Sequence, residues 1–176
     1  MILIINGSVG SGKTAVSWEL QTRFDSAVML DGDYIGAVHP FEIYDNQRIE
    51  YLYDTLQMLV GFHHAHGYQN FVINYVFESD DSLRSLIRRL SGIIPDIHCF
   101  WLTCSDQKQK ERIAQRNTDQ ADWELQRFSE LNAIQARAAA AGYIGDPINT
   151  TDLSIPQVAD QIWTTIADDS PERTGH

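Results

Sequence analysis

The sequence predicts an α/β protein in which helices cover both faces of a parallel β-sheet. Short apolar runs of β type alternate with segments of helical periodicity along all 176 residues, a pattern typical of that architecture. The length suffices for one domain with a full core and is too short for two ordinary domains. We therefore expect a single domain over residues 1–176, with a frayed tail from about residue 169.

Five apolar runs are expected to form the strands. They are Ile2–Ile5, Ala27–Leu30, Asn70–Val76, Ile97–Thr103 and Pro147–Asn149. The first run has no charged leader and enters a glycine-rich segment directly, so we interpret it as a strand and not as a signal peptide. No apolar run approaches the roughly 20 residues that cross a bilayer. A cytoplasmic protein without membrane contact is therefore expected.

Helices are expected between these strands, where apolar residues recur at spacings of three and four. The expected helical segments are 15–23, about 49–67, 79 or 80 to 90, a segment after 105, 123–142 and 154–166. Ser79 or Asp80 can cap the third segment, and Ser154 with Gln157 has the spacing of a capping box before the last. A polar interruption near 117–122 separates the fourth segment from the fifth.

The most specific signal is a motif between the first strand and the first helix. Residues 7–14 read GSVGSGKT and match G-x-x-x-x-G-K-[ST], in which backbone N–H groups and a helix N-terminus hold the β-phosphate of a nucleotide. The lysine reaches the β- and γ-phosphates, and the threonine hydroxyl ligates Mg²⁺. The residues expected to bind the nucleotide phosphates are Gly7, Ser8, Val9, Gly10, Ser11, Gly12, Lys13 and Thr14.

Two carboxylates directly follow the second strand, where Asp31 and Asp33 flank Gly32. Because ligands bind at the carboxyl ends of parallel strands, both should face the phosphates. Phosphoryl transfer to a hydroxyl group needs a carboxylate that orients or deprotonates the nucleophile, together with oxygen ligands for Mg²⁺. We assign Asp33 as the acceptor of the substrate proton and Asp31 as the metal ligand, with an ordinary Asp-Gly turn as the alternative.

The third strand carries Asn74 where many nucleotide hydrolases with this loop place an acidic partner of Mg²⁺. A neutral residue argues against a motor ATPase or a switch GTPase. Either metal support comes from the Asp31 region, or Asn74 contacts substrate, or it is simply a polar strand end.

Basic residues recur on the helix expected after the fourth strand. Lys108, Arg112 and Arg116 are four residues apart and share one helical face. Arginine stabilises the charge that spreads over the γ-phosphate during transfer, and we assign this role to Arg116 with support from Arg112. A solvated cation near a helix C-terminus is the alternative. Arg127, beyond the polar interruption, could also close over the nucleotide.

The histidines give weaker signals. His63, His64 and His66 have no cysteine or acidic ligand close in sequence, so we interpret them as surface residues and not as a zinc site. His39 lies nearer the expected crevice and could line the substrate pocket or belong to a turn.

Charge and cysteine content limit the possible partners. The formal net charge of −11 repels nucleic acid and anionic membrane, so a polynucleotide substrate is not expected. Cys99 and Cys104 are the two cysteines and are expected to be reduced structural thiols.

The phosphate loop, the Asp31-Gly32-Asp33 turn and the Arg112–Arg116 helix together resemble the small-molecule kinases of the P-loop superfamily. Gluconate kinase, shikimate kinase, adenylylsulfate kinase and chloramphenicol phosphotransferase are the nearest types. The resemblance spans nearly the whole chain in element order. It implies a three-layer fold with a five-stranded parallel sheet of order 2-3-1-4-5, helices on both faces and a mobile lid, here near 116–123. It also implies that the loop after the fifth strand packs on adenine, which places Asn149, Thr150 and Thr151 there.

The sequence departs from two of these kinases in the expected acceptor region. Shikimate and gluconate kinases need arginines for a substrate carboxylate, whereas the segment 14–83 contains only Arg23 and Arg48. Aromatic residues are present instead: Tyr34, Phe41, Tyr44, Tyr75 and Phe77. A neutral or partly aromatic hydroxyl compound, such as an antibiotic or a nucleoside-like molecule, therefore fits better than a sugar acid. Core packing is the alternative role for these aromatics.

The sequence thus predicts an ATP- and Mg²⁺-dependent kinase that transfers the γ-phosphate to a hydroxyl group of a small molecule. Two alternatives stay open. One is a regulatory nucleotide-binding module or slow ATPase without phosphoryl transfer, and the other is a nucleoside or nucleotide kinase. No pattern distinguishes ATP from GTP, or a monomer from a homodimer.

Overall fold

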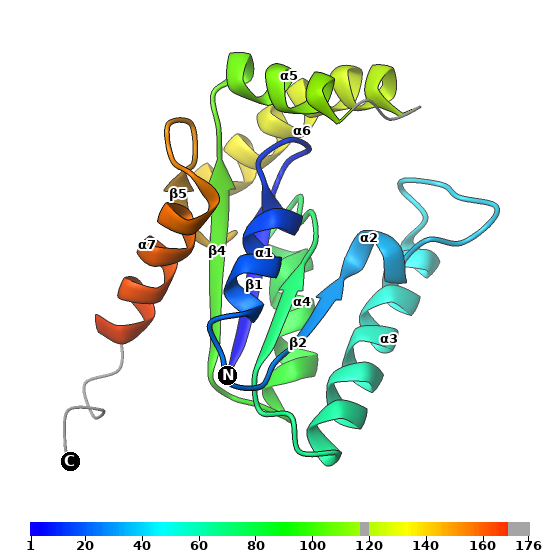
Figure 1. Cartoon of the computed structure of the whole chain (residues 1–176). Coiled ribbons are helices and arrows are strands. Elements are labelled where there is room, and N and C mark those ends of the chain that lie inside the picture. The colour runs from blue at the N-terminus through cyan, green and yellow to red at the C-terminus, as the bar shows by residue number, and fades with distance from the viewer. Residues whose placement is uncertain (117–119, 169–176) are drawn as a thin grey trace.

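Five parallel strands form one sheet in the computed structural model, which describes residues 1–116 and 120–168 (Figure 1). The strand order is β2-β3-β1-β4-β5, so the expected order is confirmed, and every adjacent pair is parallel. The strands are β1 Ile2–Gly7, β2 Val28–Asp31, β3 Phe71–Asn74, β4 Ile97–Thr103 and β5 Asp146–Asn149. Each overlaps a predicted strand, because continuous apolar runs are typical of strands buried on both faces.

Helices occupy the connections between the strands. They are α1 Lys13–Gln21, α2 Gly32–Ile35, α3 Asn46–Ala65, α4 Asp80–Ser91, α5 Asp106–Gln115, α6 Ala121–Ala141 and α7 Ile155–Asp168. The predicted cap Ser79 begins α4, and Ser105 begins α5 where a helix was expected to follow it; each side chain accepts a hydrogen bond from a backbone N–H group. The short helix α2 was expected only as a turn, and it forms because the Asp31 side chain accepts from the backbone N–H groups of Asp33 and Tyr34.

The sheet separates two apolar cores. Alternate residues of a strand point to opposite faces: Ile2 and Ile4 of β1 pack with α3 and α4, whereas Leu3 and Ile5 pack with α1 and α7. The result is the expected three-layer arrangement, visible in Figure 1 as the sheet with α1 and α7 before it and α4 behind it.

Helices α5 and α6 lie at the carboxyl edge of the sheet, beside the loop that joins β1 to α1 (Figure 1). The lid expected near 116–123 includes residues 117–119, which lie outside the described residues, as does the tail expected from residue 169. Among the described helices, none combines the length and the apolar character needed to cross a bilayer.

Candidate active site

The phosphate loop leaves the end of β1 and turns sharply into α1. Gly10 and Gly12 have φ angles of 77° and 103°, a backbone conformation that glycine adopts without strain. A Cβ atom at Gly10 would also lie 3.1 Å from the Ile113 side chain of α5. Glycine at these positions therefore lets the loop curl closely beneath α5.

The ammonium group of Lys13 is buried at the centre of this loop. Its side chain begins α1, its exposed fraction is 8%, and its Nζ donates to the Ser8 carbonyl at 3.2 Å. Burial lowers the pKa of Lys13, an effect that nearby Asp33 opposes and Arg116 reinforces. A buried ammonium group that has the Ser8 carbonyl as its hydrogen-bond acceptor among the described residues is suited to receive an anion.

Three oxygen-bearing side chains fit a magnesium ion next to the loop. Thr14 Oγ1 donates to Asp31 Oδ2 at 3.2 Å, and the other Asp31 oxygen caps α2. Asp31 pairs in register with Asn74 of β3. Asn74 is fully buried, and neither polar atom of its amide has a hydrogen-bond partner within the described chain. Because Mg²⁺ prefers oxygen ligands and retains several waters, hydroxyl, carboxylate and amide oxygens suit it.

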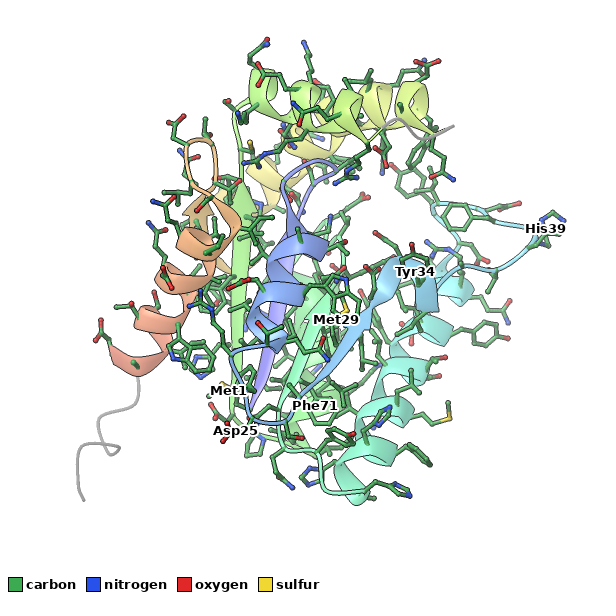
Figure 2. All side chains as sticks on the ribbon, in the orientation of Figure 1. Met1, Asp25, Met29, Tyr34, His39 and Phe71 are labelled. Atoms are coloured by element: carbon green, nitrogen blue, oxygen red, sulfur yellow. The ribbon has the colours of Figure 1, made fainter. Side chains whose placement is uncertain are left out.

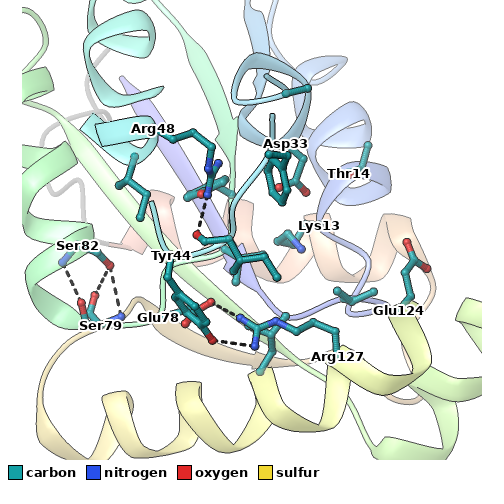
Figure 3. A pocket seen from close by; sticks show the side chains of 18 of the residues that line it. Lys13, Thr14, Asp33, Tyr44, Arg48, Glu78, Ser79, Ser82, Glu124 and Arg127 are labelled. Atoms are coloured by element: carbon teal, nitrogen blue, oxygen red, sulfur yellow. Dashed lines mark hydrogen bonds and ion pairs between the residues drawn. The ribbon is translucent and has the colours of Figure 1, made fainter. Parts of the chain in front are cut away.

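Asp33 lies on α2, on the side of the cavity that also carries Lys13 and Thr14 (Figure 3). Its carboxylate is exposed and makes no hydrogen bond or ion pair with any described residue. The preceding residue must be glycine for a steric reason: a Cβ atom at Gly32 would lie 2.7 Å from the Tyr75 ring. The Asp31-Gly32-Asp33 turn therefore packs closely on the end of β3 and presents Asp33 to the cavity.

The cavity has a volume of about 1140 Å³ and extends from the phosphate loop towards α3, α4 and α6 (Figure 3). Of the aromatics expected near the acceptor, Phe41, Tyr44 and Tyr75 line it. Phe77 does not, because it is fully buried in the core under α3 and α4. Tyr34 does not either, since its side chain is exposed on α2 (Figure 2).

The two arginines of α5 occupy different places. Arg116 lines the cavity and pairs with Glu124 of α6 at 3.4 Å. Arg112 instead donates to the carbonyl of Thr150 at 2.7 Å and to the Thr150 hydroxyl at 3.0 Å. The Thr150 hydroxyl also lies 3.1 Å from the carbonyl of Ser11 in the phosphate loop. Arg112 thus ties the segment after β5 to the phosphate loop.

The neighbouring Thr151 stabilises the same segment. Its hydroxyl donates to Asn149 at 2.6 Å and accepts from the backbone N–H of Ser105 at 3.0 Å. The segment expected to pack on adenine is therefore held to both the end of β5 and the start of α5.

Arg127 of α6 holds together the far part of the cavity (Figure 3). Its guanidinium donates to Glu78 at 2.8 Å and to the Tyr44 hydroxyl at 3.0 Å, and it also pairs with Glu130. The prediction that Arg127 could close over the nucleotide did not foresee these partners, because Tyr44 and Glu78 lie far from it in sequence and in no recognisable motif.

A second polar network beneath the phosphate loop was also not predicted. Gln109 Nε2 donates to Ser8 Oγ at 2.6 Å and to the Val9 carbonyl at 2.7 Å. Ser8 Oγ donates to Asn132 Oδ1 at 2.5 Å. Glutamine and asparagine in helices have no distinctive sequence signal, so the sequence does not indicate a role for Gln109 or Asn132. They join α5 and α6 to the loop.

The histidines lie away from the cavity. His39 is at the tip of the segment between α2 and α3 and points away from the sheet (Figure 2). This position favours a role in the turn over a role in lining the pocket. His64 and His66 contact backbone carbonyls of Tyr68 and Phe62 at the end of α3.

Comparison with known proteins gives matches in three-dimensional structure. No family model matches the sequence, and no curated protein matches it. A sugar kinase from Janibacter sp. HTCC2649 superposes with a TM-score of 0.68 at 15% identity, over 99% of this chain and 98% of its own. The chain has the fold of the P-loop small-molecule kinases.

Two further structures share this P-loop kinase fold. The Deinococcus radiodurans tunicamycin resistance protein has a TM-score of 0.65 at 20% identity, over 94% of both chains. Shikimate kinase from Acinetobacter baumannii, determined in complex with shikimate, has a TM-score of 0.62 at 14% identity, over 97% of this chain and 95% of its own. The resemblance inferred from the motifs is therefore confirmed at the level of the fold.

Proposed function

We propose that this protein is an ATP- and Mg²⁺-dependent kinase that transfers the γ-phosphoryl group to a hydroxyl group of a small molecule. One observation carries the proposal: a single cavity contains both Lys13 of the phosphate loop and the Asp33 carboxylate. No described residue forms an ion pair or hydrogen bond with that carboxylate. A nucleotide-binding module without transfer has no need of a carboxylate at this place.

In the proposed reaction the acceptor oxygen attacks the γ-phosphorus. A new O–P bond forms while the bond from the γ-phosphorus to the β–γ bridging oxygen breaks, and ADP leaves with that electron pair. Asp33 accepts the hydroxyl proton. Lys13 and the loop amides hold the phosphates, and Arg116 offsets the charge on the transferred group.

Thr14 and Asp31 would hold the Mg²⁺, with Asn74 supporting one of its waters. When bound, Mg²⁺ would neutralise part of the charge of the nucleotide phosphates. Thr150 and Thr151 would contact the nucleotide base. For Arg112 the bonds to Thr150 favour positioning of this base-binding segment over the direct support of the γ-phosphate that we expected from the sequence.

The substitution Asp33→Asn tests the proposal. It preserves the shape of the side chain and removes the proton acceptor, so we expect acceptor-dependent ATP consumption to fall about 10²–10⁴-fold, with nucleotide affinity retained. Asp25→Asn is the matched control, because Asp25 lies at the opposite edge of the sheet (Figure 2).

The same experiment separates the alternatives. A regulatory module or slow ATPase would consume ATP at a rate that neither the acceptor nor Asp33→Asn changes. A nucleoside kinase would show the Asp33 dependence with nucleosides alone as acceptors.

A further inference from the structure

The part of the cavity beyond Asp33 is lined by two buried arginines, Arg48 and Arg127, each 7% exposed. Arg48 donates to the backbone carbonyls of Glu42 at 3.1 Å and Ile43 at 3.0 Å, and its guanidinium lies 4.6 Å from the centre of the Phe41 ring. These contacts hold the segment before α3 in place. The Arg48 guanidinium is therefore already occupied by contacts within the protein and is less available to an anionic ligand.

The Arg127 guanidinium is occupied by charged partners. It pairs with two carboxylates, Glu78 and Glu130, and also donates to Tyr44. One guanidinium with two carboxylates leaves a net negative charge on the cluster. An acidic acceptor could bind Arg127 only by displacing a carboxylate that is already hydrogen-bonded to it.

Other acidic groups face the same space. Asp33 and Asp81 both line the cavity, and within the described chain neither carboxylate forms an ion pair. Glu50 also lines it and pairs with Arg89. An acceptor with a carboxylate or phosphate group would thus meet like charges, which oppose binding.

Exposed aromatic rings complete the lining. Phe41, Tyr44 and Trp123 are 53%, 63% and 48% exposed, respectively, and all three line the cavity. Arg48 and Arg127 already lie over one face of the Phe41 and Tyr44 rings. The remaining surface of these rings and the Trp123 ring offer apolar contact to a flat group.

We propose that the acceptor is a non-anionic hydroxyl compound with a flat apolar portion, and that this site discriminates against carboxylate and phosphate acceptors. The inference rests on the proposed kinase function and specifies its substrate class. It distinguishes this site from one that recognises a sugar acid, although the fold is the same.

The test uses hydroxyl compounds in matched pairs that differ only in charge. Suitable pairs are shikimate with methyl shikimate and 4-(hydroxymethyl)benzoate with its amide. Sugar acids and nucleoside carboxylates are each paired in the same way with their methyl ester or amide. Phosphorylated product is measured with MgATP, and binding is measured separately by calorimetry on protein saturated with Mg²⁺ and a non-hydrolysable ATP analogue. We expect the uncharged member to be favoured about tenfold or more in both measurements.

The two measurements separate the two proposals. Preferential binding of the uncharged members without any product would support the site's selectivity and contradict the kinase function. Equal or better use of the acidic members would overturn the selectivity while leaving the kinase function intact. Absence of binding by every pair at millimolar concentration would also overturn it.

Glu78→Gln tests the origin of the selectivity. It removes one carboxylate from Arg127, so the preference for the uncharged member should narrow about fivefold or more. Glu130→Gln is the matched control, because Glu130 also pairs with Arg127 but does not line the described cavity, and a smaller change is expected. An unchanged preference in a folded Glu78→Gln protein would overturn the inference. If Glu78→Gln does not fold, Asp81→Asn at the exposed α4 position makes the same test.

Discussion

At the scale of single residues, Lys13 shows how function and stability oppose each other. Its ammonium group is buried with the Ser8 carbonyl as acceptor, and burial lowers its pKa. Among the described residues no carboxylate forms a direct ion pair with Lys13, so the neighbouring Asp33 offsets only part of the cost of burying this cation until an anion binds. The sequence predicted the role of Lys13 from the motif but could not predict this cost, which depends on the residues packed around it.

We predict that Lys13→Met leaves the free energy of unfolding of the nucleotide-free protein unchanged or raises it by about 1 kcal/mol. Addition of MgATP should no longer raise the melting temperature. The folded pKa of Lys13 lies below its ordinary value of 10.5, so the unfolded state binds more protons as the pH approaches 10.5. The stability difference between the two proteins should therefore be largest at neutral pH and shrink on the alkaline side. A lower stability of Lys13→Met at pH 7 would contradict this account.

The two cysteines should differ in reactivity. Burial raises the pKa of Cys99 to about 12, so its thiol stays protonated and unreactive. Cys104 is partly exposed, and its sulfur lies 3.4 Å from Arg112 Nη1. We expect iodoacetamide to label Cys104 first in the folded protein, with bound nucleotide slowing the reaction, as measured by peptide mass spectrometry. Equal labelling of Cys99 without unfolding would contradict its burial.

At the scale of elements, periodicity predicted almost every helix and strand because each hydrophobic pattern is local. The caps Ser79 and Ser105 are local too. The contacts that join elements were not predictable in this way. Gln109 meets Ser8 across 101 residues, and Arg127 meets Tyr44 across 83, so no spacing rule indicates either contact.

The contact from α5 to the phosphate loop gives a prediction at this scale. Gln109→Ala leaves the Val9 carbonyl and Ser8 hydroxyl without their donor, and should lower the free energy of unfolding by about 1–3 kcal/mol. Because these hydrogen bonds hold the phosphate loop against α5, the dissociation constant for MgATP should rise as well. Gln107→Ala is the matched control, since Gln107 lies on the same helix and bonds only the exposed Glu111 among the described residues. Chemical denaturation and calorimetry measure the two effects, and equal behaviour of the two variants would refute the role of Gln109.

At the scale of the whole molecule, the sheet order explains why distant residues share one cavity. The carboxyl ends of β1, β2 and β3 lie side by side, which brings the phosphate loop next to Asp33. Helix α6 adds Trp123 and Arg127 to the lining of the same cavity. The alternation of elements predicted the parallel sheet, but its order came from the resemblance to P-loop kinases. The partners that occupy Arg48 and Arg127 in the acceptor part of the cavity could be identified only from the three-dimensional structure.

The most direct test of the account follows the phosphoryl group itself. The protein is incubated with Mg²⁺, γ-labelled ATP and a panel of uncharged hydroxyl compounds, and the label is traced by mass spectrometry. We predict that it appears in a phosphate monoester of one acceptor class and that Asp33→Asn abolishes this product. Label found solely in inorganic phosphate, at a rate that neither the acceptor nor Asp33→Asn alters, would contradict the proposed kinase.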